Sequence, residues 1–200
     1  ANAISSDPLF NSTTNLQPYI GSPLVGAGTS VTGITTDILG ITRNTPPTIG
    51  AYEQAGDFAA PTITYTGISN TLCTTAPTLS ATITDLSGIN TTAGTKPRMY
   101  YKKSTDNNAF VGNTSSDNGW KYVEATNSSS PFSFTPDYSL LQSAVAGGDV
   151  IQYFVVAQDM AGTPNVGINS GVFNTAPTSV ALTTSAFPIG GTINSYSILS

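Results

Sequence analysis

The sequence predicts an all-β protein, and three observations support that class. Charged residues make up only 8% of the 200 residues, and the runs of Ala, Leu, Glu and Lys that build helices are scarce. Short runs of β-branched and aromatic residues recur instead, separated by Gly, Pro, Asn and Ser. The longest such run, residues 149–162, is apolar on both faces when it is read at period two.

This run is the strand around which the rest of the chain is expected to assemble. Alternate residues point to opposite faces of a sheet, so apolar side chains on both faces require a cover on both sides. We therefore expect the run to be the central strand of a β-sandwich. One face carries Ile151, Tyr153, Val155 and Ala157, and the other carries Val150, Phe154 and Val156.

The first 53 residues are rich in turn formers, among them Asp7-Pro8, Gly21-Ser22-Pro23 and Pro46-Pro47. Only very short apolar pieces lie between these turns, so the segment cannot bury enough surface to fold as a domain by itself. Residues 54–60 are expected to be a linker, and Pro61 follows it.

Residues 61–187 carry strand signals at intervals typical of a β-sandwich. In the third strand, Met99 and Tyr101 are predicted to point inward, and Arg98, Tyr100 and Lys102 outward. Seven strands predict an immunoglobulin-like or fibronectin-III-like β-sandwich, and residues 188–200 are expected to be a linker to a further module. The strands are expected at residues 62–66, 79–84, 98–102, 120–123, 132–134 and 150–158, with a last one at 180–187.

Four short motifs in the first 53 residues occur in an order that resembles a known family. They are Asp7 to Phe10, Ser22 to Gly28, Thr36 to Gly40 with Arg43, and Ile49 to Glu53. They resemble the closing segment of right-handed parallel β-helix proteins of the pectin-lyase-like class, found in large secreted or cell-surface Bacteroidetes proteins. Gly26 and Thr48 stand where that family usually has aspartates. The resemblance implies that residues 1–53 are the terminal coils of a right-handed parallel β-helix, whose body would lie upstream.

A second resemblance concerns the central strand and the residues before it. Leu140 or Leu141, then Gly148, then residues 153–159 resemble bacterial fibronectin-III-like and Ig-like modules. The resemblance implies that Tyr153 packs in the core and that its hydroxyl reaches the backbone of residues 138–148. Such a motif defines a fold and not a reaction.

Two turns share the form Asp-x-small-Gly, namely Asp85 to Gly88 and Asp159 to Gly162. The strands that precede them are expected to run in the same direction, so both turns should meet at one end of the sandwich. Two carboxylates there can contribute to a Ca²⁺ site, which needs several oxygen ligands. The favoured interpretation is that each Asp opens a type I turn and each Gly closes it. A calcium ion bound by Asp85 and Asp159 is the one cofactor that the sequence suggests.

Five of the six basic residues lie in one predicted hairpin, together with two aromatic residues. Such a surface can bind an acidic polysaccharide or a cell-surface glycan through charge and ring stacking. The favoured alternative is that lysines on a peripheral strand prevent sheets from pairing edge to edge. The basic residues are Lys96, Arg98, Lys102, Lys103 and Lys121, and the aromatic ones are Tyr100 and Trp120.

Few residues of the chain suit catalysis. It has no His and one Cys, which excludes an intrachain disulfide, a structural zinc site and the usual catalytic triads. Asp37 and Glu53 match the closing motif, but a pair of catalytic carboxylates must face each other in a cleft, and turn roles are commoner. We therefore predict no catalytic residues and no enzyme. Cys73 is expected to be a small, buried or half-buried apolar residue.

The sequence thus predicts a non-catalytic structural or adhesive module of a large modular secreted or cell-surface bacterial protein, acting as a spacer or adhesin unit outside the cell. Its partners would be neighbouring modules of the same chain, and a polysaccharide if the basic hairpin binds one. The alternative is the ancillary tail of a polysaccharide lyase or glycoside hydrolase. No apolar run is long enough for a membrane span, and the net charge of −5 argues against nucleic-acid binding.

Overall fold

A computed structural model of the protein describes residues 4–19, 21–54 and 56–200. Residues 1–3, 20 and 55, which belong to the predicted N-terminal segment and linker, lie outside the described residues. The chain divides into two compact units, Ala1–Ala59 and Ala60–Ser200, which we call unit 1 and unit 2.

Unit 1 is built mainly from turns. Its described residues form two isolated β-bridges, Phe10 with Pro18 and Thr36 with Thr42. None of its described Leu, Ile, Val or aromatic side chains is fully buried, whereas several polar ones are. Unit 1 is therefore held by hydrogen bonds more than by an apolar core. Its buried polar residues are Ser22, Asp37, Thr48 and Glu53.

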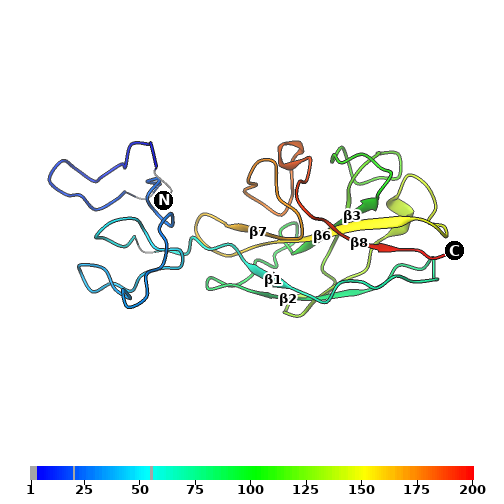
Figure 1. Ribbon diagram of the computed structural model, residues 1–200, viewed down its shortest axis with the longest axis horizontal. Helices are drawn as coiled ribbons and strands as arrows, with labels where there is room; N and C mark the ends of the chain where they lie inside the picture. Colours follow the sequence, from blue (N-terminus) through cyan, green and yellow to red (C-terminus); the bar gives the residue numbers. More distant parts are fainter. Residues whose placement is uncertain (1–3, 20, 55) are drawn as a thin grey trace. The chain divides into compact units, whose positions relative to one another are not determined.

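Unit 2 contains two antiparallel sheets, which confirms the predicted all-β class (Figure 1). The smaller sheet has the order β1-β2-β5, and its strands are β1 (Thr62–Thr64), β2 (Leu79–Thr84) and β5 (Phe132–Phe134). The larger sheet has the order β4-β3-β6-β7, with β8 also paired with β6. Its strands are β3 (Arg98–Lys103), β4 (Lys121–Glu124), β6 (Val150–Gln158), β7 (Val166–Asn169) and β8 (Asn194–Ser197). The described helices are two short 3-10 helices, η1 (Tyr138–Leu140) and η2 (Thr184–Ala186).

β6 is the central strand of the larger sheet, as predicted. One of its edges pairs with β3, from Arg98 opposite Val156 to Lys103 opposite Ile151. Two strands share its other edge: β7 pairs with residues 155–158, and β8 pairs with the first four residues of β6. β6 thus joins the N-terminal and C-terminal parts of unit 2.

The first core lies between the two sheets. Buried and exposed residues alternate strictly along β2. Phe132 and Phe134 of β5 face Met99 and Tyr101 of β3 in the same apolar cluster. The inward orientation predicted for Met99 and Tyr101 is confirmed. β6 contributes Ile151, Tyr153, Val155 and Ala157.

A second core covers the opposite face of the larger sheet. Phe154 and Val156 of β6 pack there beside Tyr100 and Trp120. The cover comes from a later part of the chain, which supplies Val180, Leu182, Ala186, Phe187 and Ile189. Both faces of β6 are therefore buried, as the apolar residues on both faces predicted.

Two predictions for the C-terminal part are wrong. Residues 180–187 form a loop with η2 and not a strand. Their apolar side chains pack on the face of the larger sheet that carries the second core, and they do not pair with a strand. Residues 188–200 are not a linker, since they contain β8. β8 escaped prediction because Tyr196 is its one large apolar residue, and its strand conformation depends on pairing with β6. β7 was missed for a similar reason, as it contains a glycine and an asparagine.

No helix among the described residues is long and apolar enough to cross a membrane.

Candidate functional site

Motif residues of unit 1 meet in one hydrogen-bond network around Asp37 and Glu53. Oδ1 of Asp37 accepts hydrogen bonds from the N–H groups of Leu39 and Ile41, both at 2.8 Å. Its Oδ2 accepts one from the N–H of Glu53 at 2.9 Å. Burial raises the pKa of Asp37, but these donors and the nearby Arg43 guanidinium outweigh burial and bring the pKa below its ordinary value.

The carboxylate of Glu53 is held in the same way. It accepts hydrogen bonds from the N–H (3.1 Å) and the hydroxyl (2.8 Å) of Thr48 and from the side-chain amide of Asn44 (3.1 Å). The guanidinium of Arg43 lies 3.4 Å away and also donates to the carbonyls of Thr48 and Gly50. Both acids therefore hold the turns of unit 1 together, the role that the sequence favoured for them.

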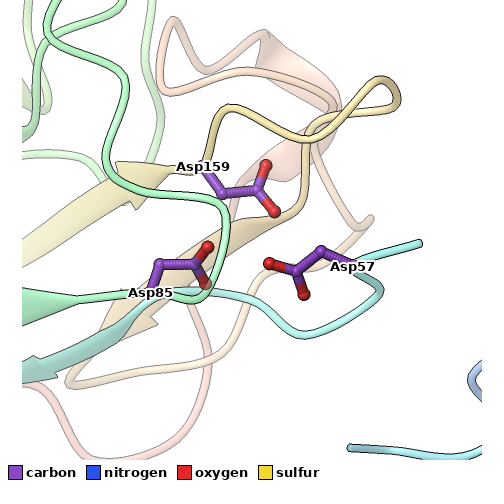
Figure 2. A group of neighbouring side chains, drawn as sticks. All are labelled: Asp57, Asp85 and Asp159. Carbon is purple, nitrogen blue, oxygen red and sulfur yellow. The ribbon is translucent and has the colours of Figure 1, made fainter. Parts of the chain in front are cut away.

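In unit 2, the two Asp-x-small-Gly turns lie together at one end of the sandwich, as predicted (Figure 2). The N–H of Met160 in one turn donates to the carbonyl of Gly88 in the other (3.1 Å). Carboxylate oxygens of Asp85 and Asp159 approach within 4.8 Å of each other. Figure 2 also labels Asp57, a residue of unit 1, whose carboxylate accepts a hydrogen bond from a backbone N–H two residues later (3.0 Å).

Both carboxylates of this turn pair accept hydrogen bonds from the chain itself. Asp159 is fully buried; its Oδ1 accepts from the N–H groups of Asn165 (2.8 Å) and Ala161 (3.3 Å). Its Oδ2 accepts from the side-chain amide of Asn165 (2.6 Å). Oδ1 of Asp85 accepts from the N–H of Ser87 (2.9 Å). A calcium ion would need about six to eight oxygen ligands and would compete with these donors, so the geometry favours the turn role.

Four of the five basic residues of the predicted hairpin are buried, and Lys96 is half-buried. Arg98, Lys102 and Lys103 belong to β3, which is flanked by β4 and β6, and each is 6% exposed or less. Lys121 lies on the edge strand β4 but is only 1% exposed. The predicted glycan-binding surface is therefore wrong. Protection of a sheet edge also fails for the three β3 residues, since β3 is an inner strand.

Two of the lysines bind the loop between β3 and β4 through its carbonyl groups. Nζ of Lys102 donates to the carbonyls of Lys103 (3.0 Å) and Asp106 (3.0 Å). Nζ of Lys121 donates to the carbonyl of Asp117 (2.6 Å). Burial lowers the pKa of both lysines, against a weaker opposite effect of Asp106 and Asp117. Each ammonium group thus fixes one turn of this loop.

Arg98 and Lys103 form ion pairs on opposite faces of β3. Arg98 pairs with Glu124 (3.1 Å), and its guanidinium lies 4.1 Å from the centre of the Tyr122 ring. Lys103 pairs with Asp149 at 2.7 Å. The first pair joins β3 to β4, and the second joins β3 to the residue directly before β6. The two basic side chains are buried, whereas Glu124 and Asp149 are partly exposed.

Tyr100 and Trp120, the aromatic residues expected to contact a ligand, belong to the second core. The hydroxyl of Tyr100 donates to the carbonyl of Val180 (2.7 Å) and accepts from the N–H of Leu182 (3.1 Å). Nε1 of Trp120 donates to the side chain of Asn108 (2.9 Å). The sequence could not show this burial, because the covering segment lies 80 residues further along the chain.

Cys73 is exposed, so the prediction of a buried or half-buried residue is wrong. It lies in the loop between β1 and β2, outside both cores.

Two surface hollows in unit 1 were not predicted. The larger has a volume of about 690 Å³ and is lined by residues 28–35, 42–45 and 47–50. The smaller, of about 260 Å³, is lined by Phe10, Leu16 and Tyr52 among others, and the two hollows share Ile49 and Gly50. The Thr-rich stretch 29–36 was the available signal in the sequence.

Comparisons of the chain with models of protein families, with curated proteins and with solved structures found no match. The geometry therefore defines the candidate sites: a turn pair in unit 2, and a hydroxyl-rich hollow beside an apolar one in unit 1.

Proposed function

We propose that the chain is a non-catalytic structural module of a large modular secreted or cell-surface bacterial protein, in which unit 2 acts as a spacer or adhesin unit. One observation carries this proposal. The chain enters unit 2 and reaches residue 200 at opposite ends of the central strand β6.

The position of each end follows from contacts within unit 2. A Cβ added to Gly167 would lie 2.4 Å from the carbonyl oxygen of Pro61, so the chain enters directly beside this glycine. Gly167 pairs with Ala157, near the end of β6. Ser200 lies beside Gly147, just before β6 begins. The nine residues of β6 span roughly 30 Å, and modules attached at the two ends would be held apart by that distance.

A force applied between these two ends would load hydrogen bonds in shear. Thr71 and Ile198 form a parallel bridge. The N–H of Thr71 donates to the carbonyl of Ser197 (3.0 Å), and the N–H of Leu199 donates to the carbonyl of Thr71 (2.7 Å). The segments around Thr71 and Ile198 run in the same direction. The first would be pulled toward residue 60 and the second toward residue 200. Their hydrogen bonds lie across the direction of force, so they share the load instead of opening one after another.

One outer edge of each sheet, β4 in the larger and β5 in the smaller, bonds to a side-chain amide. Asn113 accepts from the N–H of Tyr122 (2.8 Å) and donates to the carbonyl of the same β4 residue (3.2 Å). Asn127 accepts from the N–H of Ser133 in β5 (2.9 Å) and donates to the carbonyl of Pro131 (2.8 Å). Each amide occupies the place of a neighbouring strand. Closed edges suit a spacer, because copies of an open sheet would pair with one another.

The strand order supports an Ig-like or fibronectin-III-like assignment for unit 2. In such sandwiches the first, second and fifth strands share one sheet, and the third, sixth and seventh share the other. β1-β2-β5 and β3-β6-β7 follow this division, β4 extends the second sheet, and β8 is an addition.

Contacts among the four motifs support unit 1 as the closing segment of a β-helix. The hydroxyl of Ser22 donates to the carbonyl of Pro8 (2.6 Å), which joins the first motif to the second. The N–H of Ile49 donates to the carbonyl of Leu24 (2.9 Å), which joins the second to the fourth. The contact of Asp37 with the N–H of Glu53 joins the third to the fourth.

Single-molecule force spectroscopy on the whole chain, held at its two ends, tests the spacer role. Unit 2 should unfold in one step that lengthens the chain by roughly 500 Å, at up to ~3.6 Å per residue over residues 60–200. Thr71→Pro removes the N–H that donates to Ser197 and should lower the unfolding force. Val180→Ala, a substitution in the second core, is the matched control and should lower it less at equal thermal stability. Equal forces for the two variants, or gradual opening at low force, would contradict the proposal.

A further inference from the structure

The two hollows of unit 1 adjoin and differ in chemistry. They meet at Ile49 and Gly50, which line both. Seven of the sixteen residues that line the larger hollow carry a hydroxyl group, and Arg43 and Asn44 also line it. The smaller hollow is lined by apolar side chains, with the rings of Phe10 and Tyr52 among them. A ligand that filled both would need a polar and an apolar surface on the same molecule.

The charge of the lining restricts the ligand further. Arg43 is the one charged residue among the lining residues of both hollows. Its guanidinium pairs with the carboxylate of Glu53 at 3.4 Å and donates to the carbonyl of Gly50 at 2.8 Å. The positive charge is therefore balanced inside unit 1. A neutral ligand matches this lining better than an anionic one, because the lining residues offer no unpaired positive charge to an anion.

Some of the lining hydroxyl groups of the larger hollow are open to a ligand. Thr29, Ser30 and Thr32 are exposed. Hydroxyl and amide groups both donate and accept hydrogen bonds, so they can pair with a ligand whose own groups do both. Phe10 is 40% exposed and offers a ring face at the apolar end. A sugar ring combines these features, since its hydroxyl groups lie around the edge and its C–H groups form an apolar face.

We propose that the two hollows together bind a segment of a neutral polysaccharide. The larger hollow pairs with sugar hydroxyl groups, and the ring of Phe10 packs against the C–H face of a sugar. The combined size lies within the range of about 300–1,000 Å³ typical of ligand sites. This binding is independent of the spacer role of unit 2, and it places a glycan contact on unit 1 in place of the buried residues of β3 and β4.

Binding of the 200-residue chain to soluble galactomannan, xyloglucan and dextran tests the proposal, with polygalacturonate as the acidic comparison. Isothermal titration and affinity electrophoresis should detect at least one neutral polysaccharide. Phe10→Ala should weaken that binding at least about tenfold, because it removes the ring that packs against the sugar. Thr32→Val, which removes a hydroxyl at nearly constant volume, should weaken it about threefold or more.

Tyr19→Ala is the matched control. Tyr19 is an exposed aromatic residue of unit 1, 58% exposed, and lines neither hollow, so its removal should leave binding unchanged. All three side chains are exposed, and unchanged melting temperatures would show that the variants fold. Three outcomes would each overturn the proposal. They are no binding to any neutral polysaccharide, preference for polygalacturonate, and a self-association that Phe10→Ala abolishes, which would assign the hollow to a second copy of the chain.

Discussion

The hydroxyl of Tyr153 accepts a hydrogen bond from the N–H of Ile68 (2.8 Å), in the segment that follows β1. The sequence predicts a partner in the backbone of residues 138–148. Tyr101 approaches that region instead: its hydroxyl donates to the carbonyl of Asp137 (2.6 Å) and accepts from the N–H of the same residue (3.0 Å). Tyr101 and Tyr153 lie directly opposite each other on β3 and β6. The prediction of a buried tyrosine with a backbone partner is confirmed, and the predicted partner is wrong.

We expect Tyr153→Phe to lower the free energy of unfolding by about 1–3 kcal/mol, because it leaves the N–H of Ile68 without its acceptor. Tyr101→Phe should cost more, since it breaks two hydrogen bonds to one residue. Chemical denaturation of both variants at constant m-value measures the difference. A neutral Tyr153→Phe would show that water satisfies this N–H and that the segment after β1 is loosely held.

At the scale of elements, each face of the larger sheet is covered by segments that are distant in the sequence. The loop between β3 and β4 folds around the ammonium groups of Lys102 and Lys121. Residues 180–189 then cover Tyr100 and Trp120. Asn108 joins the two segments, because its side chain bonds to both Trp120 and the backbone of Ile189. The residues that the sequence predicts on an exposed basic hairpin are therefore covered by other segments of the chain.

The turn pair at Asp85 and Asp159 should not require calcium. We expect no change in melting temperature on adding millimolar Ca²⁺ or EDTA, because a ligand that bound only the folded state would raise it by mass action. Asp159→Asn should destabilise unit 2 by about 1–3 kcal/mol with or without calcium, since it puts an NH₂ group near the donors of Asn165.

Differential scanning calorimetry in both solutions measures these effects. A melting temperature that rises with calcium in the native chain, and no longer rises in Asp85→Asn, would establish a calcium site at this pair.

At the scale of the whole molecule, unit 2 closes only when its last strand is in place. β8 contributes Tyr196 to the first core, and Ile198, the residue directly after β8, joins it there; each is 1% exposed. The N–H of Gly148 also donates to the carbonyl of Ile198 (2.7 Å). The core is thus completed by residues outside the range 61–187 that the sequence predicted.

We expect residues 60–200 expressed alone to unfold in one cooperative thermal transition. Residues 60–187 should fail to do so, because removing one large buried side chain costs roughly 3–5 kcal/mol and a whole domain is stable by only about 5–15 kcal/mol. Calorimetry of the two fragments decides between the boundaries. Equal melting temperatures would place β8 outside the cooperative unit.

The pH dependence of stability should be flat between about pH 5 and 9, since the chain has no histidine. The acid limit comes from Asp37, Asp117 and Asp149, whose pKa values are lowered in the folded protein. Hydrogen bonds from Thr114 lower the pKa of Asp117; for Asp149, burial acts the other way but is outweighed by Lys103 and a backbone N–H. A lowered carboxyl pKa stabilises the fold above the unfolded value of about 4, and this stability is lost as the pH falls through the folded pKa.

The alkaline limit of stability comes from six tyrosines, because burial raises the pKa of their hydroxyl groups. Above about pH 10 their phenols ionise in the unfolded chain but not in the folded one, so stability falls as the pH rises. The lowered pKa values of Lys102 and Lys121 act in the opposite direction, but these are two groups against six. Tyrosinate absorbance should appear together with unfolding; ionisation of most phenols in the folded protein near pH 10 would contradict the burial. The tyrosines are Tyr65, Tyr100, Tyr101, Tyr138, Tyr153 and Tyr196.

Local patterns in the sequence determined which residues form the first core. Period-two alternation is a property of neighbouring residues, and it correctly oriented Met99 and Tyr101 of β3 and Tyr153 of β6. The turn chemistry of Asp85 and Asp159 is also local, and the common direction of β2 and β6 correctly placed both turns at one end.

Only the tertiary structure decided which polar and aromatic residues are exposed. Arg98, Lys102 and Tyr100 have the alternation of a solvent-facing edge, yet they are buried under segments that follow later in the chain. β8 likewise has almost no apolar signal of its own and becomes a strand through its hydrogen bonds to β6. The physical reason is the same in each case: the direction of a side chain depends on its neighbours in sequence, whereas its burial depends on what packs against it from far along the chain.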